Sequence, residues 1–436
     1  MFWCLDMNGF KRALDVLPVL CIKSMSVLLL FLSQVLLARV CGGPSEFGDY
    51  VLWLTCLNLV VVILKAGTDT GAIRYFSKYI DTREYFLMRK YREYALSRVL
   101  ALSCFFGIVV GIYCFYKLNF VHVVDRGLII LLVPAAFLLA HSQYRRGELI
   151  GGGFPIISEL LESMIRPLLL IIFALLALEY GYDVNASGLA KVYVFILIFT
   201  SMSAFYLASI KLPKINKTSN TMLVDQEIIL DWKVCTKGMA VNVLLRQCVK
   251  SMDILLCSVF LDSGQVAFYA VSTRLADLVV FTLSSANILF APRISVLFSR
   301  GEKKELNIYL KNMSLFVFVI GLVLYCILVL FGERILVIYG EEYIAGYSSL
   351  IVLGLGQLVN SFFGPTGYLA SMTGNQDQLT KALIFSSVLS SCAYIILIPL
   401  YGIVGAATAS MLGAVSWNII VYMRMNTLEG LKSKAF

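Results

Sequence analysis

The sequence predicts an all-α polytopic membrane protein, and three observations lead to that fold class. Hydrophobic residues make up 59% of the 436 residues and charged residues only 14%, whereas a soluble domain carries about 25% charged residues. The mean hydropathy is +0.84. Twelve apolar stretches divide the chain, and each is close to the roughly 20 residues that a helix needs to cross the hydrocarbon core. Almost none of the chain is left for a soluble domain.

The spans follow one another with short connections after the odd-numbered spans and longer, basic connections after most of the even-numbered ones. The connection between spans 2 and 3, for example, is rich in lysine and arginine between Arg74 and Arg98. The twelve predicted spans are residues 15–37, 49–66, 97–116, 127–142, 155–178, 189–210, 238–260, 267–290, 312–331, 343–364, 381–400 and 403–423.

The basic residues divide unevenly between the two sides of the membrane. Of the 36 lysines and arginines, 25 fall on one side by this assignment, four on the other, and seven at or within spans. Because positively charged loops stay in the cytoplasm, both termini are predicted to be cytoplasmic. The loops also explain the formal net charge of +9, so no nucleic-acid partner is expected.

A weak internal repeat relates the two halves. Residues Glu46–Tyr50 align with Gln265–Tyr269 at an offset of 219, and Leu59–Val61 then match Leu278–Val280. Six spans per half give both halves the same orientation, which predicts two six-helix lobes related by a parallel pseudo-twofold repeat around a central cavity. The expected domains are an N-terminal lobe at 1–210, a cytoplasmic linker at 211–237 and a C-terminal lobe at 238–436.

Span 7 carries charges in the middle of an otherwise apolar run. Arg246, Lys250 and Asp253 are spaced by four and then three residues, which puts them on one face of a helix. A charge at membrane depth costs roughly 2.5 kcal/mol or more. We therefore expect this face to meet water, a partner charge or a polar passenger, as in a transporter.

Three other spans also hold charges. Span 1 has Lys23, without an acid on its own span, and spans 5 and 8 hold acids beside arginines. One interpretation is internal ion pairing of Asp253 with Lys250, Asp277 with Arg274, and Glu162 with Arg166. The other is a cavity lining, and both stay open at this stage. The charges in spans 5 and 8 are Glu159, Glu162 and Arg166, then Arg274 and Asp277.

Motifs for other chemistries are lacking or incomplete in the sequence. The glycines Gly147 and Gly151–Gly153 resemble a glycine-rich loop, but no Gly-Lys-[Ser/Thr] follows, so we expect a flexible lead-in to span 5 rather than a phosphate site. The cysteines form no C-x-x-C pair, and no metal or other cofactor is expected. Catalytic residues are not expected either.

The basic stretch Tyr75–Tyr94 looks amphipathic. Its aromatic residues, among them Tyr79, Tyr85, Phe86 and Tyr91, alternate with lysines and arginines. We expect this stretch to lie along the inner membrane surface. The basic loops in general either bind anionic lipid headgroups or a cytoplasmic partner, or only set the topology; the second interpretation is the simpler one.

Further short motifs carry a family resemblance, which is diffuse but covers nearly the whole chain. The chain resembles the polysaccharide (O-antigen repeat-unit) flippases, a branch of the multidrug/oligosaccharidyl-lipid/polysaccharide exporter superfamily. The residues that carry the resemblance are Gly67–Arg74, Asp253–Leu256, Ala267–Ala270, Arg274–Leu275, Ala291–Ser295, Gly301, Gly340–Tyr347, Gly364–Gly374, Pro399–Gly402 and Gly405–Ala407.

The resemblance implies a function. It implies a flippase that moves an undecaprenyl-diphosphate-linked oligosaccharide, the repeat unit of O-antigen or a capsule, across the bacterial inner membrane by alternating access. Membrane lipids, a glycan polymerase and chain-length proteins are the implied partners. Spans 1, 7 and 8 would line the cavity, so Lys23, Arg246, Lys250 and Arg274 become the candidates for holding the diphosphate. The candidates for coupling to an H⁺ or Na⁺ gradient are Glu159, Glu162, Asp253 and Asp277.

Two other functions compete with this one. A multidrug exporter of the same superfamily often carries cations, which favours an acidic cavity, whereas these spans hold a basic excess. A membrane glycan polymerase or glycosyltransferase usually needs sizeable outer loops, and the longest outer connections here, near 332–342 and 37–48, are only about a dozen residues. Both alternatives remain, the enzyme as the weaker one.

Overall fold

The computed structural model describes residues 7–116, 126–213, 224–431 and 433–435. In these residues nearly all regular structure is helical, and strand pairing is limited to one isolated bridge between Cys41 and Val184. The helices are α1 (Met7–Val40), α2 (Pro44–Lys65), α3 (Thr68–Asp81), α4 (Tyr85–Tyr116), α5 (Arg126–Gly151), α6 (Pro155–Glu159), a π-helix (Leu160–Ile165), α7 (Arg166–Glu179), α8 (Ala186–Lys211), α9 (Gln226–Phe260), α10 (Ser263–Ser299), α11 (Lys303–Val337), a 3₁₀-helix (Glu341–Gly346), α12 (Tyr347–Phe363), α13 (Thr366–Met372) and α14 (Gln376–Glu429).

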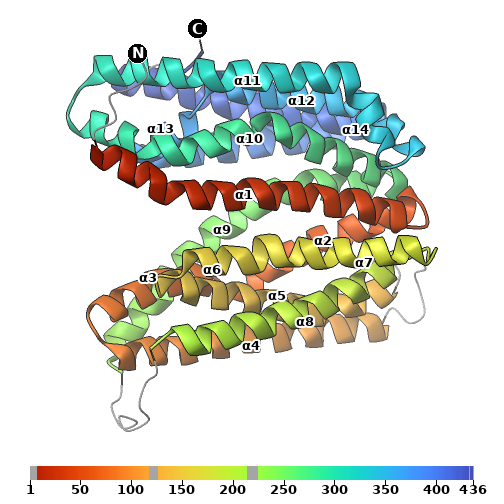
Figure 1. Cartoon of the computed structure of the whole chain (residues 1–436), viewed down its shortest axis with the longest axis horizontal. Helices are drawn as coiled ribbons and strands as arrows, with labels where there is room; N and C mark the ends of the chain where they lie inside the picture. The colour runs from red at the N-terminus through yellow and green to blue at the C-terminus, as the bar shows by residue number, and fades with distance from the viewer. Residues whose placement is uncertain (1–6, 117–125, 214–223, 432, 436) are drawn as a thin grey trace. The chain divides into compact units, whose positions relative to one another are not determined.

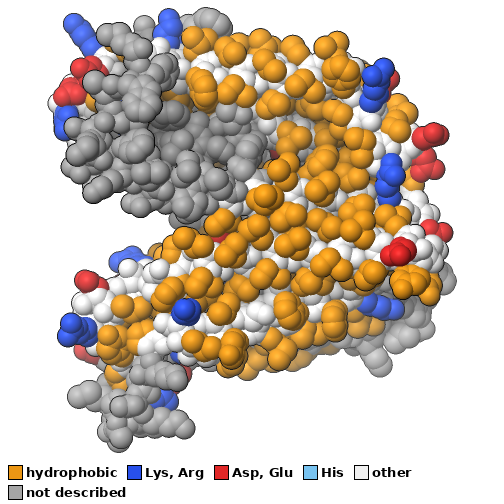
Figure 2. All heavy atoms as spheres, in the orientation of Figure 1, with side chains coloured by type: hydrophobic (Ala, Val, Ile, Leu, Met, Phe, Trp, Pro, Cys, Tyr) orange, Lys and Arg blue, Asp and Glu red, His pale blue; other side chains and the backbone are white. Residues whose placement is uncertain are grey.

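Each predicted span lies in helical structure, and the helices overrun most of the predicted bounds. In the described part of the chain, eight helical segments are long and apolar enough to cross a membrane, and the longest, α14, contains the last two predicted spans. Figure 2 shows hydrophobic side chains covering the middle of the helices, with charged side chains gathered toward the helix ends. The predicted fold class, an all-α polytopic membrane protein, is confirmed.

The chain forms two compact units. The first consists of residues 1–20, 43–48 and 252–436, and the second of residues 21–42 and 49–251. In the first unit α12 packs against α10, α11 and α14, and in the second α5 packs against α3, α4 and α8 (Figure 1). Helix α9 is divided between the units after Ser251, so most of its length packs with the second unit.

Several helix boundaries have a local cause. Asn185 caps α8 by accepting a hydrogen bond from the N–H of Gly188 at 2.9 Å, and Asp262 caps α10 in the same way. Within α14, Gly402 takes φ 59° and ψ −136°, a conformation that only glycine adopts readily. It follows Pro399, and together they break the segment into the two predicted spans.

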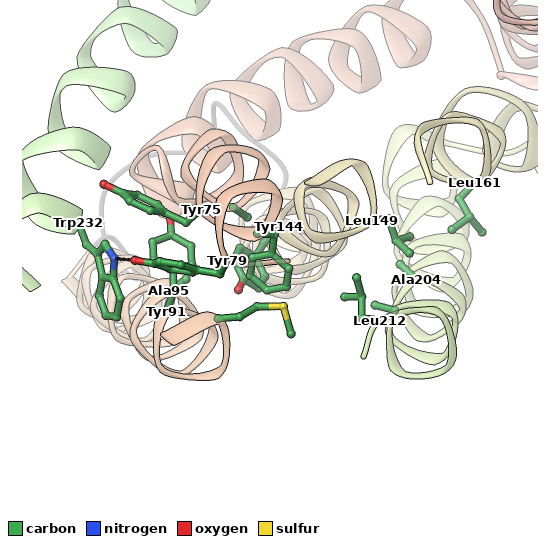
Figure 3. Packing of buried hydrophobic residues seen from close by; sticks show 14 residues of the cluster. Tyr75, Tyr79, Tyr91, Ala95, Tyr144, Leu149, Leu161, Ala204, Leu212 and Trp232 are labelled. Atoms are coloured by element: carbon green, nitrogen blue, oxygen red, sulfur yellow. Dashed lines mark hydrogen bonds between the residues drawn. The ribbon is translucent and has the colours of Figure 1, made fainter. Parts of the chain in front are cut away.

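The core of the second unit is built around aromatic side chains from α3, α4 and α9 (Figure 3). The Nε1–H of Trp232 donates to the hydroxyl of Tyr79 at 2.8 Å. The ring of Tyr91 packs against Tyr75, with centroids 4.9 Å apart, and against Trp232, with centroids 5.4 Å apart. Buried aromatic rings of this size contribute large apolar areas, so this aromatic cluster holds the start of α9 to α3 and α4.

Within the stretch Tyr75–Tyr94, Tyr79 and Tyr91 are buried in the aromatic cluster, whereas Tyr85 is exposed. The expectation of a flexible lead-in at Gly147 and Gly151 is wrong, because α5 runs through Gly147 and ends only at Gly151. A Cβ atom at Gly147 would collide with the carbonyl oxygen of Asp69, and one at Gly151 with α3. These glycines allow α3 to approach α5 closely.

Candidate functional site

Two charged residues of α9 are exposed in an apolar stretch. Arg246 and Lys250 lie one helical turn apart and share one face of α9. Neither forms an ion pair with any residue that the structure describes in their unit. The geometry of this pair, which we call the cationic turn (Arg246 and Lys250), matches the sequence prediction of two cations on one face.

Asp253 continues the same helix and belongs to the other unit. Its carboxylate accepts the N–H of Ile254 at 2.8 Å and the hydroxyl of Tyr269 on α10 at 3.4 Å. Both donors are neutral. Among the residues described in that unit, the structure shows no ion pair to Asp253, so its negative charge is balanced only by dipoles and more distant charges.

Helix α10 contributes Arg274 and Asp277 to the same unit. Arg274 is half-buried, whereas Asp277 is exposed. Gln357 on α12 donates its Nε2–H to Asp277 at 3.0 Å, which fixes this carboxylate against α12. The sequence predicted both residues within a span, and the structure places them one turn apart on α10.

The acids of span 5 lie at a π-helix, Leu160–Ile165, between α6 and α7. Pro167 follows this segment and lacks the N–H that an α-helix would bond to the preceding turn, so the backbone widens here. Glu159 lies immediately before the π-helix and Glu162 inside it. The bulge therefore presents both carboxylates to α5.

Both carboxylates are held by one arginine of α5. Arg146 donates from Nη2 to Glu159 and from Nη1 to Glu162, each at 2.7 Å. Gln143 donates to Glu162 at 3.1 Å and Ser163 to Glu159 at 2.8 Å. We call Arg146, Glu159 and Glu162 the Arg146 clamp. Charge-assisted hydrogen bonds of this length are strong, so the clamp joins α5 to the π-helix.

The predicted pair of Glu162 with Arg166 is present but loose. The Nη1 atom of Arg166 lies 3.9 Å from Glu162, and the Nε and Nη2 atoms of this buried side chain have no hydrogen-bond partner among the described residues. Arg146 is thus the main partner of Glu162. The sequence reasoning missed Arg146 because it ended span 4 at residue 142, whereas α5 runs to Gly151.

A second ionic network lies on the same helix. Glu148 is fully buried and accepts hydrogen bonds from Arg92 on α4 at 2.7 Å and from Arg145 at 2.8 Å. The hydroxyl of Tyr144 donates to the same carboxylate at 2.9 Å. Sequence reasoning assigned these residues to a cytoplasmic loop. The network ties α4 to α5 and leaves no exposed charge on Glu148.

Lys23, the fourth predicted diphosphate ligand, belongs to α1, but its side chain lies outside the part that the structure describes. The four predicted cations come from α1, α9 and α10, and Arg274 lies in a different compact unit from the others. The four predicted acids fall into two groups, Glu159 and Glu162 in one unit and Asp253 and Asp277 in the other.

Comparison with solved structures identifies the fold. The chain is similar to the lipid II flippase MurJ in an inward closed conformation, with a TM-score of 0.72, 14% identity and coverage of 93% of this chain and 87% of that chain. It is also similar to an inward-facing multidrug resistance MATE family transporter of the MOP superfamily (TM-score 0.69, 17% identity, 93% and 96% coverage). A MOP superfamily transporter from Pyrococcus furiosus matches at 0.62, with 16% identity and 96% and 95% coverage.

No protein-family model matches the sequence, and neither does any curated protein sequence. The solved structures share less than a fifth of their residues with this chain, so the likeness is one of fold. The chain has the fold of MOP superfamily transporters over nearly its whole length.

Proposed function

We propose that this protein is a flippase that moves an undecaprenyl-diphosphate-linked oligosaccharide, such as an O-antigen or capsule repeat unit, from the cytoplasmic to the outer leaflet of the bacterial inner membrane. The cationic turn is the observation that carries this proposal, because two exposed cations lie within the otherwise apolar stretch 239–260 of α9 without an acid paired to them in their unit. The MOP transporter fold supports the proposal. A flippase makes and breaks no covalent bond.

The cationic turn suits a diphosphate chemically. The guanidinium of Arg246 offers a planar fork of donors to phosphate oxygens, and Lys250 adds a compact positive charge one turn away. In our proposal Lys23 and Arg274 complete the set of diphosphate ligands. The negative charge of the passenger then offsets the cost of keeping cations at membrane depth.

The acids divide into stronger and weaker candidates for ion coupling. Glu159 and Glu162 already share Arg146 at 2.7 Å, so protonating either one would break a short ion pair. Asp253 has only neutral donors at hydrogen-bond distance. We infer that Asp253, with Asp277 on α10 of the same unit, is the more suitable site for proton or sodium coupling, and that the Arg146 clamp is mainly structural.

The arrangement in the membrane is part of the proposal. The basic connections place both termini in the cytoplasm, with six-helix lobes at 1–210 and 238–436 joined by the linker 211–237. The passenger and membrane lipids are the direct partners. A glycan polymerase and chain-length proteins would act on the oligosaccharide after it reaches the outer leaflet.

A multidrug exporter is the second candidate function. The similarity to a multidrug resistance transporter and the absence of a short-range cation on Asp253 among the residues described in its unit favour it. The cationic turn argues against a cationic passenger. Export of a cationic dye separates the two functions, because Arg246→Glu should increase dye export only if the cavity normally carries cations.

Complementation tests the proposed function. The wild-type chain is expressed in bacterial strains that lack an O-antigen flippase and supply different repeat units, beside Arg246→Ala, Lys250→Ala and Arg274→Ala at equal membrane abundance. We expect surface glycan with the wild type and its loss with these variants. The matched control is Lys304→Ala, an exposed cation at the start of α11, which should keep the glycan. Glycan that persists in all three variants would contradict the assigned site.

A further inference from the structure

A second cationic site lies away from the cationic turn, between α4 and α9. A pocket of about 370 Å³ is lined there by Tyr94, Ser97, Arg98, Lys233 and Lys237. Three of its five residues are cations, and none is an acid. All five belong to the same compact unit. A pocket of this composition concentrates positive potential and attracts an anion.

Hydrogen bonds hold Arg98 in place in the wall of the pocket. The guanidinium of Arg98 donates from Nη1 to the hydroxyl of Tyr94 at 2.8 Å and to the hydroxyl of Thr236 on α9 at 3.1 Å. It also lies over the Tyr94 ring, 6.0 Å from the centroid. These contacts join α4 to α9 and use neutral partners only, so the positive charge of Arg98 is left for a ligand.

The aromatic cluster orients the α9 side of the pocket. Trp232 and Thr236 are buried, which turns Lys233 and Lys237, one turn apart, to the exposed face. Of the nearby acids, Asp231 is turned toward α3, where it accepts the hydroxyl of Tyr75 at 2.8 Å. On α4, Glu93 is bound by Arg89 and Lys90 at 3.0 and 2.9 Å. No lining cation forms an ion pair within the described residues of this unit.

Exposed apolar side chains continue from the cations along both helices. On α9, Val241 and Leu245 follow Lys237 at spacings of four and are exposed, so they share its face. On α4, Phe105 and Ile108 are exposed about two and three turns beyond Arg98. A ligand that fits both parts has an anionic head and hydrocarbon chains, which is the construction of a charged lipid.

We propose that the pocket lined by Arg98, Lys233 and Lys237 binds the phosphate-bearing headgroup of an anionic phospholipid, with the acyl chains along the exposed faces of α4 and α9. Basic pockets between membrane helices bind such headgroups through charge and hydrogen bonds. Arg98 supplies directional donors, and the two lysines supply charge. The bound lipid would fill the pocket between α4 and the start of α9.

Native mass spectrometry of the full-length chain tests this proposal. The purified protein is titrated with phosphatidylglycerol and, separately, with phosphatidylcholine. We expect preferential binding of phosphatidylglycerol and about thirty-fold weaker affinity in Lys233→Gln/Lys237→Gln, since each lysine near a headgroup is worth roughly fivefold in affinity. The control Lys304→Gln/Lys311→Gln removes two exposed lysines elsewhere and should bind as the wild type does.

Three outcomes would overturn the proposal. Equal phosphatidylglycerol affinity in the pocket variant and the wild type would show that the lysines do not hold the lipid. Equal binding of phosphatidylcholine would show that charge is not recognised. Displacement of phosphatidylglycerol by inorganic phosphate at a similar concentration would identify a site for the free anion instead of a lipid.

Discussion

The Arg146 clamp and the cationic turn are two groups of charges on apolar helices, and the fold treats them differently. In the clamp, one arginine meets two carboxylates at 2.7 Å across a π-helix. In the cationic turn, Arg246 and Lys250 stay exposed and without an ion pair in the described part of their unit. The first group is complete within the protein, whereas in our proposal the second binds an anion of the passenger.

This difference separates structural charges from candidate ligand-binding charges. A buried ion pair is costly to break because the remaining charge loses its partner. A cation at membrane depth costs energy unless water or an anion meets it. Removing a structural charge should therefore lower stability first, and removing a ligand-binding charge should lower affinity without changing stability.

The largest stability effect is expected at Glu148, the most enclosed of the paired acids. Glu148→Ala leaves Arg92 and Arg145 facing each other without the carboxylate that joins them. We expect a loss of about 3–5 kcal/mol in the free energy of unfolding, seen as a much lower melting temperature in detergent. Glu93→Ala is the control, since its ion pairs are exposed and worth about 0–1 kcal/mol. Similar melting of the two variants would contradict the structural role.

In the Arg146 clamp, removing the two acids should restore the stability that is lost when Arg146 is removed. Arg146→Gln leaves Glu159 and Glu162 without their shared cation, and we expect a loss of about 2 kcal/mol, moderated by the partial exposure of Arg146. Adding Glu159→Gln and Glu162→Gln removes the uncompensated charges and should restore most of the melting temperature. If the triple variant melts as low as Arg146→Gln, the clamp is not the source of the stability.

A smaller effect is expected in the aromatic cluster. Trp232→Phe keeps most of the ring but removes the N–H that donates to Tyr79, and one hydrogen bond is worth about 1 kcal/mol. Tyr79→Phe removes the acceptor. In a double-mutant cycle on the melting free energy, the two changes should be non-additive by about that amount. Additive effects would mean that the pair contributes through ring packing alone.

Hydropathy predicted the spans well because a helix must satisfy its own backbone hydrogen bonds in lipid and must be apolar over a fixed length. It predicted the ends of helices poorly. The predicted span 4 ends at residue 142, whereas α5 continues to Gly151. The helix can continue because the charges of its last part are neutralised by Glu159, Glu162 and Arg92 from other segments. Sequence alone does not reveal such partners.

The same limit applies to glycines and aromatic residues. The sequence predicts a flexible segment at Gly147, yet this glycine marks a close approach of α3 to α5. Tyr79 and Tyr91 are covered by α9 through Trp232, a contact that the amphipathic pattern of their stretch does not reveal. By contrast, the shared face of Arg246 and Lys250 follows from spacing alone, because helical periodicity needs no tertiary contact.

Binding of a polyprenyl diphosphate to the purified protein tests the central claim most directly. We predict that Arg246→Ala/Lys250→Ala weakens the affinity for undecaprenyl diphosphate at least tenfold, since hydrogen bonds to charged groups are worth about 1.5–3 kcal/mol. The melting temperature of this variant should stay at the wild-type value. The control Lys304→Ala/Lys311→Ala should keep the wild-type affinity. Unchanged affinity in Arg246→Ala/Lys250→Ala would contradict the assignment of the cationic turn as the diphosphate site.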